Sequence, residues 1–270
     1  TEERPLVSVR SGARVSMPGM MDTILNVGLN DSNLAQWGEV LGSLEAAQDC
    51  YFRLISMFGN VVHGIPTELF EYNGNIAEKL DNAKMVYKAC TEEEFPQDFY
   101  SQLLQSVKAV FLSWNSTRAQ AYRTLNNIPH TWGTAVNVQK MVFGNKNDKS
   151  GSGVLFSRDF NTGEAKVVGE WLCNAQGEDV VNGSRHPLPL VDMEAWNAQA
   201  FSQLICFAHD LESHYGDMQD IEFTIEDGKV YILQTRNGKR AAKAAFRIAH
   251  DLCVDGRITK DDAQKAASNP

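Results

Sequence analysis

The residues best able to do chemistry lie in two neighbouring stretches, residues 220–226 (DIEFTIE) and 230–236 (VYILQTR). Apolar and polar residues alternate in the first stretch, and the bulkiest apolar pair at alternate positions in the second is Tyr231 and Leu233. Asp227-Gly228 between them is a typical turn pair, so the two stretches predict a β-hairpin. Odd-numbered residues must then lie opposite odd-numbered ones, because a shift of one residue turns every side chain to the other face. The expected apolar face consists of Ile221, Phe223 and Ile225 with Tyr231 and Leu233.

A two-residue turn would pair odd-numbered with even-numbered residues, so this register predicts a three-residue loop, Asp227-Gly228-Lys229. The other face then pairs Glu222 with Gln234 and Asp220 with Arg236. Oxygen ligands on a rigid strand pair suit Mg²⁺, and a neighbouring arginine suits phosphate oxygens. A solvated sheet face with cross-strand ion pairs is the alternative interpretation of this hairpin alone.

A second stretch that could bind a ligand lies near the start of the chain, where Arg10 and Arg14 stand beside Gly12 and Gly19. Arginines next to exposed backbone amides can hold an anionic ligand in a fixed orientation, although ordinary surface residues would have the same pattern. Weaker patterns are a glycine-rich run at 151–153, adjacent acids in residues 176–179 (QGED), and a basic helix face with Lys239, Arg240, Lys243 and Arg247. A solvated surface explains that basic face best.

The cysteines and histidines do not indicate a metal centre. The five cysteines form no CxxC pair, and the six histidines show no HExxH spacing. Scattered thiols are typical of buried, reduced side chains in a cytosol-like compartment. The predicted localisation is therefore cytoplasmic, with an organelle left open because a targeting segment would precede Thr1.

The helices and strands expected to position these residues indicate an α/β (α+β) protein. The chain has 270 residues and a formal net charge of −9, which argues against a general nucleic-acid binder. No apolar run approaches the roughly 20 residues that a bilayer requires, so no membrane association is expected. Helical spacing of apolar residues predicts helices within 33–126, 193–215, 238–252 and 259–267. Strands are expected at 6–10, 134–143, 154–157 and 166–173, besides the hairpin.

Four long motifs resemble pyruvate, phosphate dikinases. They are SVRSGARVSMPGMMDTILNVGLND (8–31), WGTAVNVQKMVFGN (132–145), NAQGEDVV (174–181) and DMQDIEFTIEDGKVYILQTRNGKR (217–240). The resemblance implies the C-terminal lobe of an ATP-grasp domain, with a mixed or antiparallel sheet and a helical insertion. It further implies three regions: a discontinuous lobe of 1–32 and 131–240, an insertion at 33–130, and helices at 241–270 that lead to a linker.

The resemblance also implies roles for individual residues. Arg10, Arg53 and Arg236 would contact the phosphates of ATP, with Gly19 nearby, and Asp220, Glu222 and Gln234 would bind Mg²⁺ or organise the phosphates. Glu170, Glu178 and Asp179 would line the nucleotide pocket, and the strand with Gln139, Met141 and Val142 would border the adenine. In such enzymes the β-phosphoryl group of ATP passes to a histidine in a mobile domain and then to pyruvate in a barrel, which gives phosphoenolpyruvate, AMP and diphosphate.

Departures from the family pattern predict that this chain is a fragment. An N-terminal lobe with a phosphate-binding lysine would lie upstream, and neither a phosphohistidine loop nor a pyruvate barrel is found in the sequence. Ser152 stands where the family usually has threonine, and residues 66–97 are shorter than usual. A piece of a phosphoenolpyruvate synthase-like dikinase, or a non-catalytic nucleotide-binding protein, are the alternatives. The full-length form is expected to be a homo-oligomer.

Overall fold

The computed structural model describes residues 5–17, 19–181 and 185–268. Its contacts divide the chain into two compact units, Thr1–Met141 and Val142–Pro270. Both units combine helices with antiparallel strands, so the expected α/β class with antiparallel sheet is confirmed at this level. Pro18 of the MPGMM motif lies outside the described residues.

The first unit contains a sheet in the order β2-β1-β3. Strand β1 (Val7–Ala13) pairs antiparallel with β2 (Thr23–Val27) on one side and with β3 (Thr134–Lys140) on the other. The described helices of this unit are α1 (Leu34–Leu41), α2 (Leu44–His63), α3 (Ile76–Thr91), α4 (Phe99–Ser113) and α5 (Thr117–Leu125), with short 3₁₀ turns at Thr67–Phe70 and His130–Trp132. Strand β2 is not among the strands predicted from the sequence.

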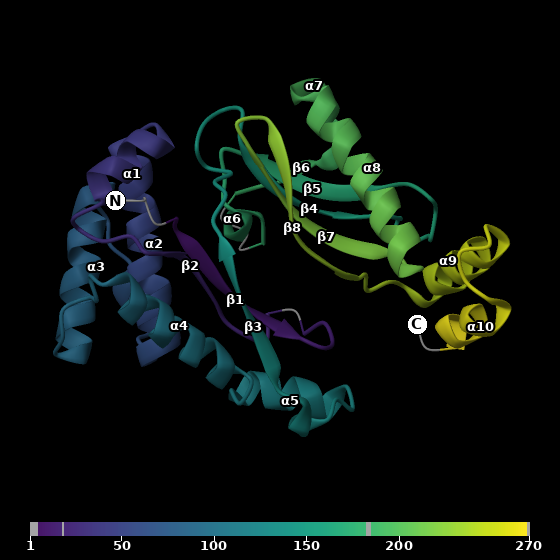
Figure 1. Ribbon diagram of the computed structural model, residues 1–270, viewed down its shortest axis with the longest axis horizontal. Coiled ribbons are helices and arrows are strands. Elements are labelled where there is room, and N and C mark those ends of the chain that lie inside the picture. Colours follow the sequence, from purple (N-terminus) through teal and green to yellow (C-terminus); the bar gives the residue numbers. More distant parts are fainter. Residues whose placement is uncertain (1–4, 18, 182–184, 269–270) are drawn as a thin grey trace. The chain divides into compact units, whose positions relative to one another are not determined.

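Helix α2 is the central helix of the first unit. Its apolar residues recur at helical spacing, and Tyr51, Leu54 and Phe58 are fully buried. Ser43 accepts a hydrogen bond from the Ala46 amide at its start, and Gly64 ends it in the left-handed conformation. In Figure 1, α2 and α3 lie side by side, in agreement with their many contacts.

The second unit contains a sheet in the order β6-β5-β4-β7-β8. These strands are β4 (Gly151–Phe156), β5 (Val168–Cys173), β6 (Leu188–Pro189), β7 (Gln219–Glu226) and β8 (Lys229–Asn237). The described helices are α6 (Gly177–Val181), α7 (Met193–Trp196), α8 (Ala198–Tyr215), α9 (Ala242–Val254) and α10 (Lys260–Ser268), with a 3₁₀ turn at Leu190–Asp192. The predicted hairpin of 220–236 is present as β7 and β8, and the strands expected at 154–157 and 166–173 are present as β4 and β5, which pair antiparallel.

Helix α8 covers one face of this sheet (Figure 1). The core between them contains Leu204 and Ala208 from the helix and Trp171, Ile221 and Phe223 from the strands. The single helix predicted over 193–215 is wrong, because the chain is extended at Asn197 (φ −155°) between α7 and α8. There the Asn197 side chain accepts a hydrogen bond from Ala200 and caps α8.

The division at Met141 does not test the predicted grouping of 1–32 with 131–240 or the insertion at 33–130. Strand β1 pairs with β3, which joins residues 7–13 to residues 134–140 within the first unit. Residues 241–270 belong to the second unit, since α9 packs on Met218 beside β7. The assignment of segments to a nucleotide-binding lobe and an insertion stays a prediction.

Two further expectations concern the cysteines and the membrane. All five cysteines are free thiols, but only Cys50 is buried, whereas Cys90 and Cys206 are exposed, so burial of all five was wrong. Within the part of the chain that the structure describes, no helix has the length and apolar character needed to span a bilayer.

Candidate functional site

The predicted metal and phosphate ligands lie on the hairpin of β7 and β8. Glu222 pairs with Gln234 and Asp220 pairs with Arg236, so the predicted pairing is confirmed. The predicted three-residue loop is wrong. The turn is the dipeptide Asp227-Gly228, with φ of 50° and 79°, and such positive values at both central residues are typical of a type I′ turn.

A β-bulge reconciles the tight turn with the pairing at the base of the hairpin. Phe223 lies opposite Ile232, whereas the preceding Glu222 lies opposite Gln234, so Leu233 is the extra residue. A bulge of this kind changes the register by one residue and increases the local twist.

The bulge also changes which side chains complete the apolar face. Near the turn, Val230 and Ile232 pack with Phe223 in the core beneath α8, instead of the predicted Tyr231 and Leu233. Tyr231 lies opposite Thr224 on the other face. The apolar side of β7 itself was predicted correctly, since Ile221, Phe223 and Ile225 are all buried.

On the opposite face, one guanidinium lies between two carboxylates. Arg236 Nε donates to Asp220 Oδ2 at 2.8 Å, and its terminal nitrogen is 3.8 Å from Glu222 Oε1. The Arg236 and Glu222 side chains are each 26% exposed, so both remain accessible to a ligand. Two carboxylates against one guanidinium leave an excess negative charge that a cation would neutralise.

Three of the predicted site residues form one row across four strands. Glu170 of β5 lies opposite Val154 of β4, Val154 opposite Glu222 of β7, and Glu222 opposite Gln234 of β8. Residues in such a row project from the same face of a sheet, with neighbouring strands about 4.8 Å apart. The sheet therefore brings Glu170, Glu222 and Gln234 together on the face opposite α8.

The short helix α6 lies on this same face, where Val180 packs against Val154 and Leu172. It carries the predicted Glu178 and Asp179. Asp179 is buried, and its Oδ2 accepts the Gln176 amide at 3.0 Å. A carboxylate at this position stabilises the first turn of a helix, so Asp179 has a structural function besides any contact with a ligand.

In the first unit, Arg10 and Gln139 lie on one face of the smaller sheet. Arg10 pairs with Asn137, and Gln139 pairs with Ser8, two residues before Arg10. Met141 continues the strand, because its amide donates to the Leu6 carbonyl at 2.9 Å. Gln139 therefore lies near Arg10, whereas Met141 lies farther along the strand, opposite Leu6, and Val142 is the first residue of the second unit.

The segment with Gly19 is held by Arg118 of helix α5 and by Trp114, the residue after α4. Arg118 donates through Nε to the Met20 carbonyl at 3.2 Å and also binds Asp22, while Met17 packs against Trp114. Gly19 has a φ of 67°, and a side chain there would meet no neighbouring atom within 4 Å. Glycine is favoured at this position for its backbone conformation and not by crowding.

Arg53 lies on α2, apart from the β-strands. Its Nε donates to Asp49 Oδ2 one helical turn earlier, at 2.7 Å. Arg14 stacks over the Trp132 ring, with the guanidinium carbon 4.9 Å from the ring centroid.

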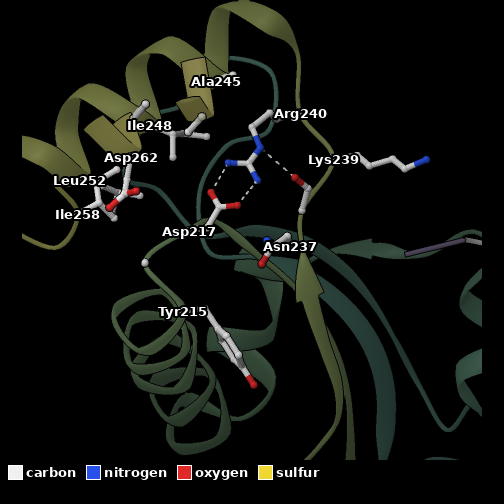
Figure 2. A pocket seen from close by; sticks show the side chains of 14 residues that line it. Tyr215, Asp217, Asn237, Lys239, Arg240, Ala245, Ile248, Leu252, Ile258 and Asp262 are labelled. Atoms are coloured by element: carbon white, nitrogen blue, oxygen red, sulfur yellow. Dashed lines mark hydrogen bonds and ion pairs between the residues drawn. The ribbon is translucent and has the colours of Figure 1, made fainter. Parts of the chain in front are cut away.

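A cavity of about 700 Å³ in the second unit lies between the end of the hairpin and helices α9 and α10 (Figure 2). Figure 2 shows Arg240 paired with Asp217 through both terminal nitrogens, and the bond to Oδ2 measures 2.8 Å. The opposite wall is apolar, with Ile248 and Leu252. None of the predicted ligands lines this cavity, so it does not form part of the candidate site.

The oxygen ligands on the hairpin match a hard cation better than a transition metal. Among the described residues, no group of three or more histidine, cysteine, aspartate or glutamate side chains could hold a metal ion. Mg²⁺ needs fewer protein ligands, because it keeps waters and takes substrate phosphates together with one or two carboxylates. Glu222 and the Gln234 carboxamide, which face each other, fit that requirement.

The sequence interpretation missed Gln219, which lies immediately before Asp220. It is a polar residue on the buried side of β7, and its side chain is fully hydrogen-bonded to neighbouring strand residues. The signal was available: Gln219 has the same parity as Ile221 and Phe223, so the apolar face of the strand begins with a buried amide.

Comparison with known proteins gives one family. The model of the family described as "Pyruvate phosphate dikinase, AMP/ATP-binding domain" matches residues 1–196 and 189–253.

Several curated relatives are similar over nearly the whole chain. Pyruvate, phosphate dikinase of Clostridium symbiosum is 50% identical over 282 residues, which cover 97% of this chain and 32% of that protein. The Giardia intestinalis protein of the same name is 47% identical over 281 residues, covering 96% and 32%. Pyruvate, phosphate dikinase 1, chloroplastic, of Zea mays is 47% identical over 282 residues, covering 97% and 30%. The chain thus spans about a third of the length of these relatives.

Proposed function

Because the chain belongs to the family of pyruvate phosphate dikinase AMP/ATP-binding domains, we propose that it binds the phosphates of ATP and Mg²⁺ through the face of β7 and β8 that carries Asp220, Glu222, Gln234 and Arg236. The observation that supports this most directly is the cross-strand arrangement itself. Two carboxylates, a carboxamide and a guanidinium lie on adjacent pairs of one rigid hairpin.

Each residue of this set has a defined contribution. The triphosphate of ATP carries several negative charges, and Arg236 supplies the planar donor fork that recognises phosphate oxygens. Asp220 fixes the orientation of that fork through the 2.8 Å hydrogen bond to Nε, which leaves the terminal nitrogens for the ligand. Glu222 and Gln234 would hold Mg²⁺, which neutralises phosphate charge when bound.

The remaining predicted residues belong to the same proposal. Glu170 extends the row from Glu222, and Glu178 and Asp179 lie on α6 at the same face. In the first unit, Arg10, Arg53 and Gly19 would contact or border the phosphates, and the strand with Gln139 and Met141, followed by Val142, would border the adenine. Phosphoryl transfer depends mostly on positioning and charge neutralisation, which is what these side chains can supply.

We further propose that the chain serves as the ATP-binding part of a pyruvate, phosphate dikinase. In that enzyme the β-phosphoryl group of ATP would pass to a histidine of another domain and then to pyruvate, with phosphoenolpyruvate, AMP and diphosphate as products. The names of the relatives support this reaction over that of a phosphoenolpyruvate synthase. A homo-oligomeric, cytoplasmic or organellar enzyme is part of the same proposal, since one of these relatives is named chloroplastic.

The experiment that tests the binding proposal is calorimetric titration with Mg-ATP. It compares the complete polypeptide that contains this chain with its Arg236→Ala variant. We expect Arg236→Ala to weaken Mg-ATP binding at least tenfold, because a hydrogen bond to a charged group contributes about 1.5–3 kcal/mol. Unchanged affinity, in a variant whose circular dichroism spectrum is native, would exclude the hairpin as the phosphate site.

A further inference from the structure

The buried face directly behind Asp220 and Arg236 contains a polar cluster that the proposed chemistry does not use. Its centre is Gln219, the first residue of β7, which is 1% exposed. The Gln219 side chain accepts from Thr235 Oγ1 at 2.9 Å and donates to Asn237 Oδ1 at 3.1 Å. The side-chain nitrogen Nε2 of Gln219 also donates to the Asp217 carbonyl at 3.0 Å.

The two strand partners of Gln219 are the residues on either side of Arg236. Thr235 and Asn237 project from the face of β8 opposite to that of Arg236, which pairs with Asp220; Thr235 is half-buried and Asn237 is exposed. Gln219, which directly precedes Asp220, is therefore hydrogen-bonded to the residue before Arg236 and to the residue after it. Its hydrogen bonds lie at the end of the hairpin, next to the backbone bond from Gly238 to the Met218 carbonyl.

The backbone of Gln219 is fixed from the other side by the end of β4. Its amide donates to Ser157 Oγ at 3.0 Å, and its carbonyl accepts from the Ser157 amide at 2.9 Å. The Ser157 hydroxyl in turn donates to Glu212 Oε2 at 2.7 Å. Ser157 and Glu212 are both buried, so these bonds are shielded from water and hold one geometry.

From this geometry we infer that Gln219, with Thr235 as its donor, is a positioning residue for the Asp220–Arg236 pair. The inference rests on the proposed function of that pair. Gln219 does not reach the ligand face, because residues of its parity lie beneath α8. It acts by fixing the two backbone segments from which Arg236 and Asp220 project, so that the guanidinium fork faces the phosphates without rearrangement.

Two substitutions of Thr235 test this inference, one that removes the hydroxyl with little change of shape and one that keeps it. Thr235→Val removes the donor to Gln219 Oε1 at nearly constant volume, and Thr235→Ser retains it. In the complete polypeptide, we expect Thr235→Val to lower ATP-dependent phosphoryl transfer about tenfold to a hundredfold, because small displacements of a positioned group have effects of that size. Thr235→Ser should remain within about twofold of the parent, because it keeps the hydrogen bond.

The decisive measurement repeats Thr235→Val in the Arg236→Ala background. If Thr235 acts through Arg236, the second substitution causes no further loss of transfer, because the group it positions has already been removed. Thr259→Val is the matched control: it removes an exposed hydroxyl that donates to Asp262 in the first turn of α10 and not to a residue of β7 or β8, and transfer should stay unchanged. An equal loss in both backgrounds, or no loss in either, would overturn the inference.

Two outcomes separate this inference from the proposed function. If Arg236→Ala itself leaves Mg-ATP binding and transfer unchanged, the proposed site is wrong and the positioning role with it. If Arg236→Ala is defective but Thr235→Val is not, only the positioning role is wrong. Should Thr235→Val fail to fold, Asn237→Ala carries the test, because Asn237 is exposed and its loss removes the second strand partner of Gln219.

Discussion

Glu222 and Phe223 are adjacent in the sequence and lie on opposite faces of β7, so substitutions at the two positions should affect different properties. Phe223 is 1% exposed and packs in the core beneath α8. Its ring also lies over Gly153, where an added Cβ would come within 2.5 Å of Phe223 Cζ. Glu222 is 26% exposed, and its distance of 3.8 Å from Arg236 makes only a weak ion pair.

For Phe223→Ala, we expect the free energy of unfolding of the second unit to fall by about 3–5 kcal/mol, as for other Phe→Ala changes in a core. With a urea dependence of about 2 kcal/mol per molar, the unfolding midpoint would fall by roughly 2 M. Glu222→Gln should change the unfolding free energy by less than about 1 kcal/mol, because a partly exposed, long ion pair contributes little.

The effect on activity should be the reverse. In the complete enzyme, Glu222→Gln removes one charge from the proposed Mg²⁺ site while nearly preserving its shape, so ATP-dependent phosphorylation of the histidine should fall by orders of magnitude. Exchange between pyruvate and phosphoenolpyruvate, which does not use this site, should be nearly unaffected. Urea unfolding followed by circular dichroism and the two partial reactions, measured on the same preparations, provide the comparison. A Glu222→Gln variant that loses stability as Phe223→Ala does, but retains phosphorylation, would refute both the face assignment and the proposed site.

Three further predictions concern other parts of the chain. Glu212→Gln should lower the unfolding free energy by about 3–5 kcal/mol, because it removes the charge of a buried carboxylate that pairs with Arg158 and Arg257 and leaves the buried Arg158 with only the longer pair to Asp251; a urea midpoint equal to that of the parent would contradict this. Hydrogen bonds from Lys146 and Asn147 lower the pKa of Asp227, so the stability it contributes is complete above the usual aspartate pKa of about 3.9 and is lost as the pH falls through the lower folded value. The difference in urea midpoint between the parent and Asp227→Asn should therefore shrink on acidification, and a constant difference would exclude this linkage. Finally, calorimetry should detect weak or no Mg-ATP binding by the 270-residue chain alone, and micromolar affinity would show that its site is self-contained.

The pairing at the base of the hairpin could be predicted because it depends on parity. Ile221 and Phe223 must be buried, which sends Asp220 and Glu222 to the other face and limits their partners on β8. The turn could not be predicted by the same argument, since the preference of Asp227-Gly228 for positive φ competes with parity. A bulge satisfies both, and nothing in a single sequence shows that Leu233 is the residue left over.

Elements that depend on distant contacts were predicted less well. The pairing of β1 with β3 joins segments more than 100 residues apart; strands were expected at both places, but their pairing was not predicted. No local pattern contains that information. The break at Asn197 is different, because an asparagine before a new helical run is a known N-cap signal and was overlooked within a continuous apolar pattern. Which of the named side chains contact ATP remains a prediction.

The bulge at Leu233 separates two properties of the hairpin. Removing Leu233 from the chain would leave every remaining partner in place, since Gln234 would follow Ile232 and still lie opposite Glu222. Only the extra twist between the tip and the base would be lost. The choice of partners is therefore set by the turn and the alternation of side chains, whereas the direction in which the base presents its charged face is set by one inserted leucine. Such an arrangement allows a protein to reorient a binding face by the insertion or deletion of a single residue, without changing any residue on that face.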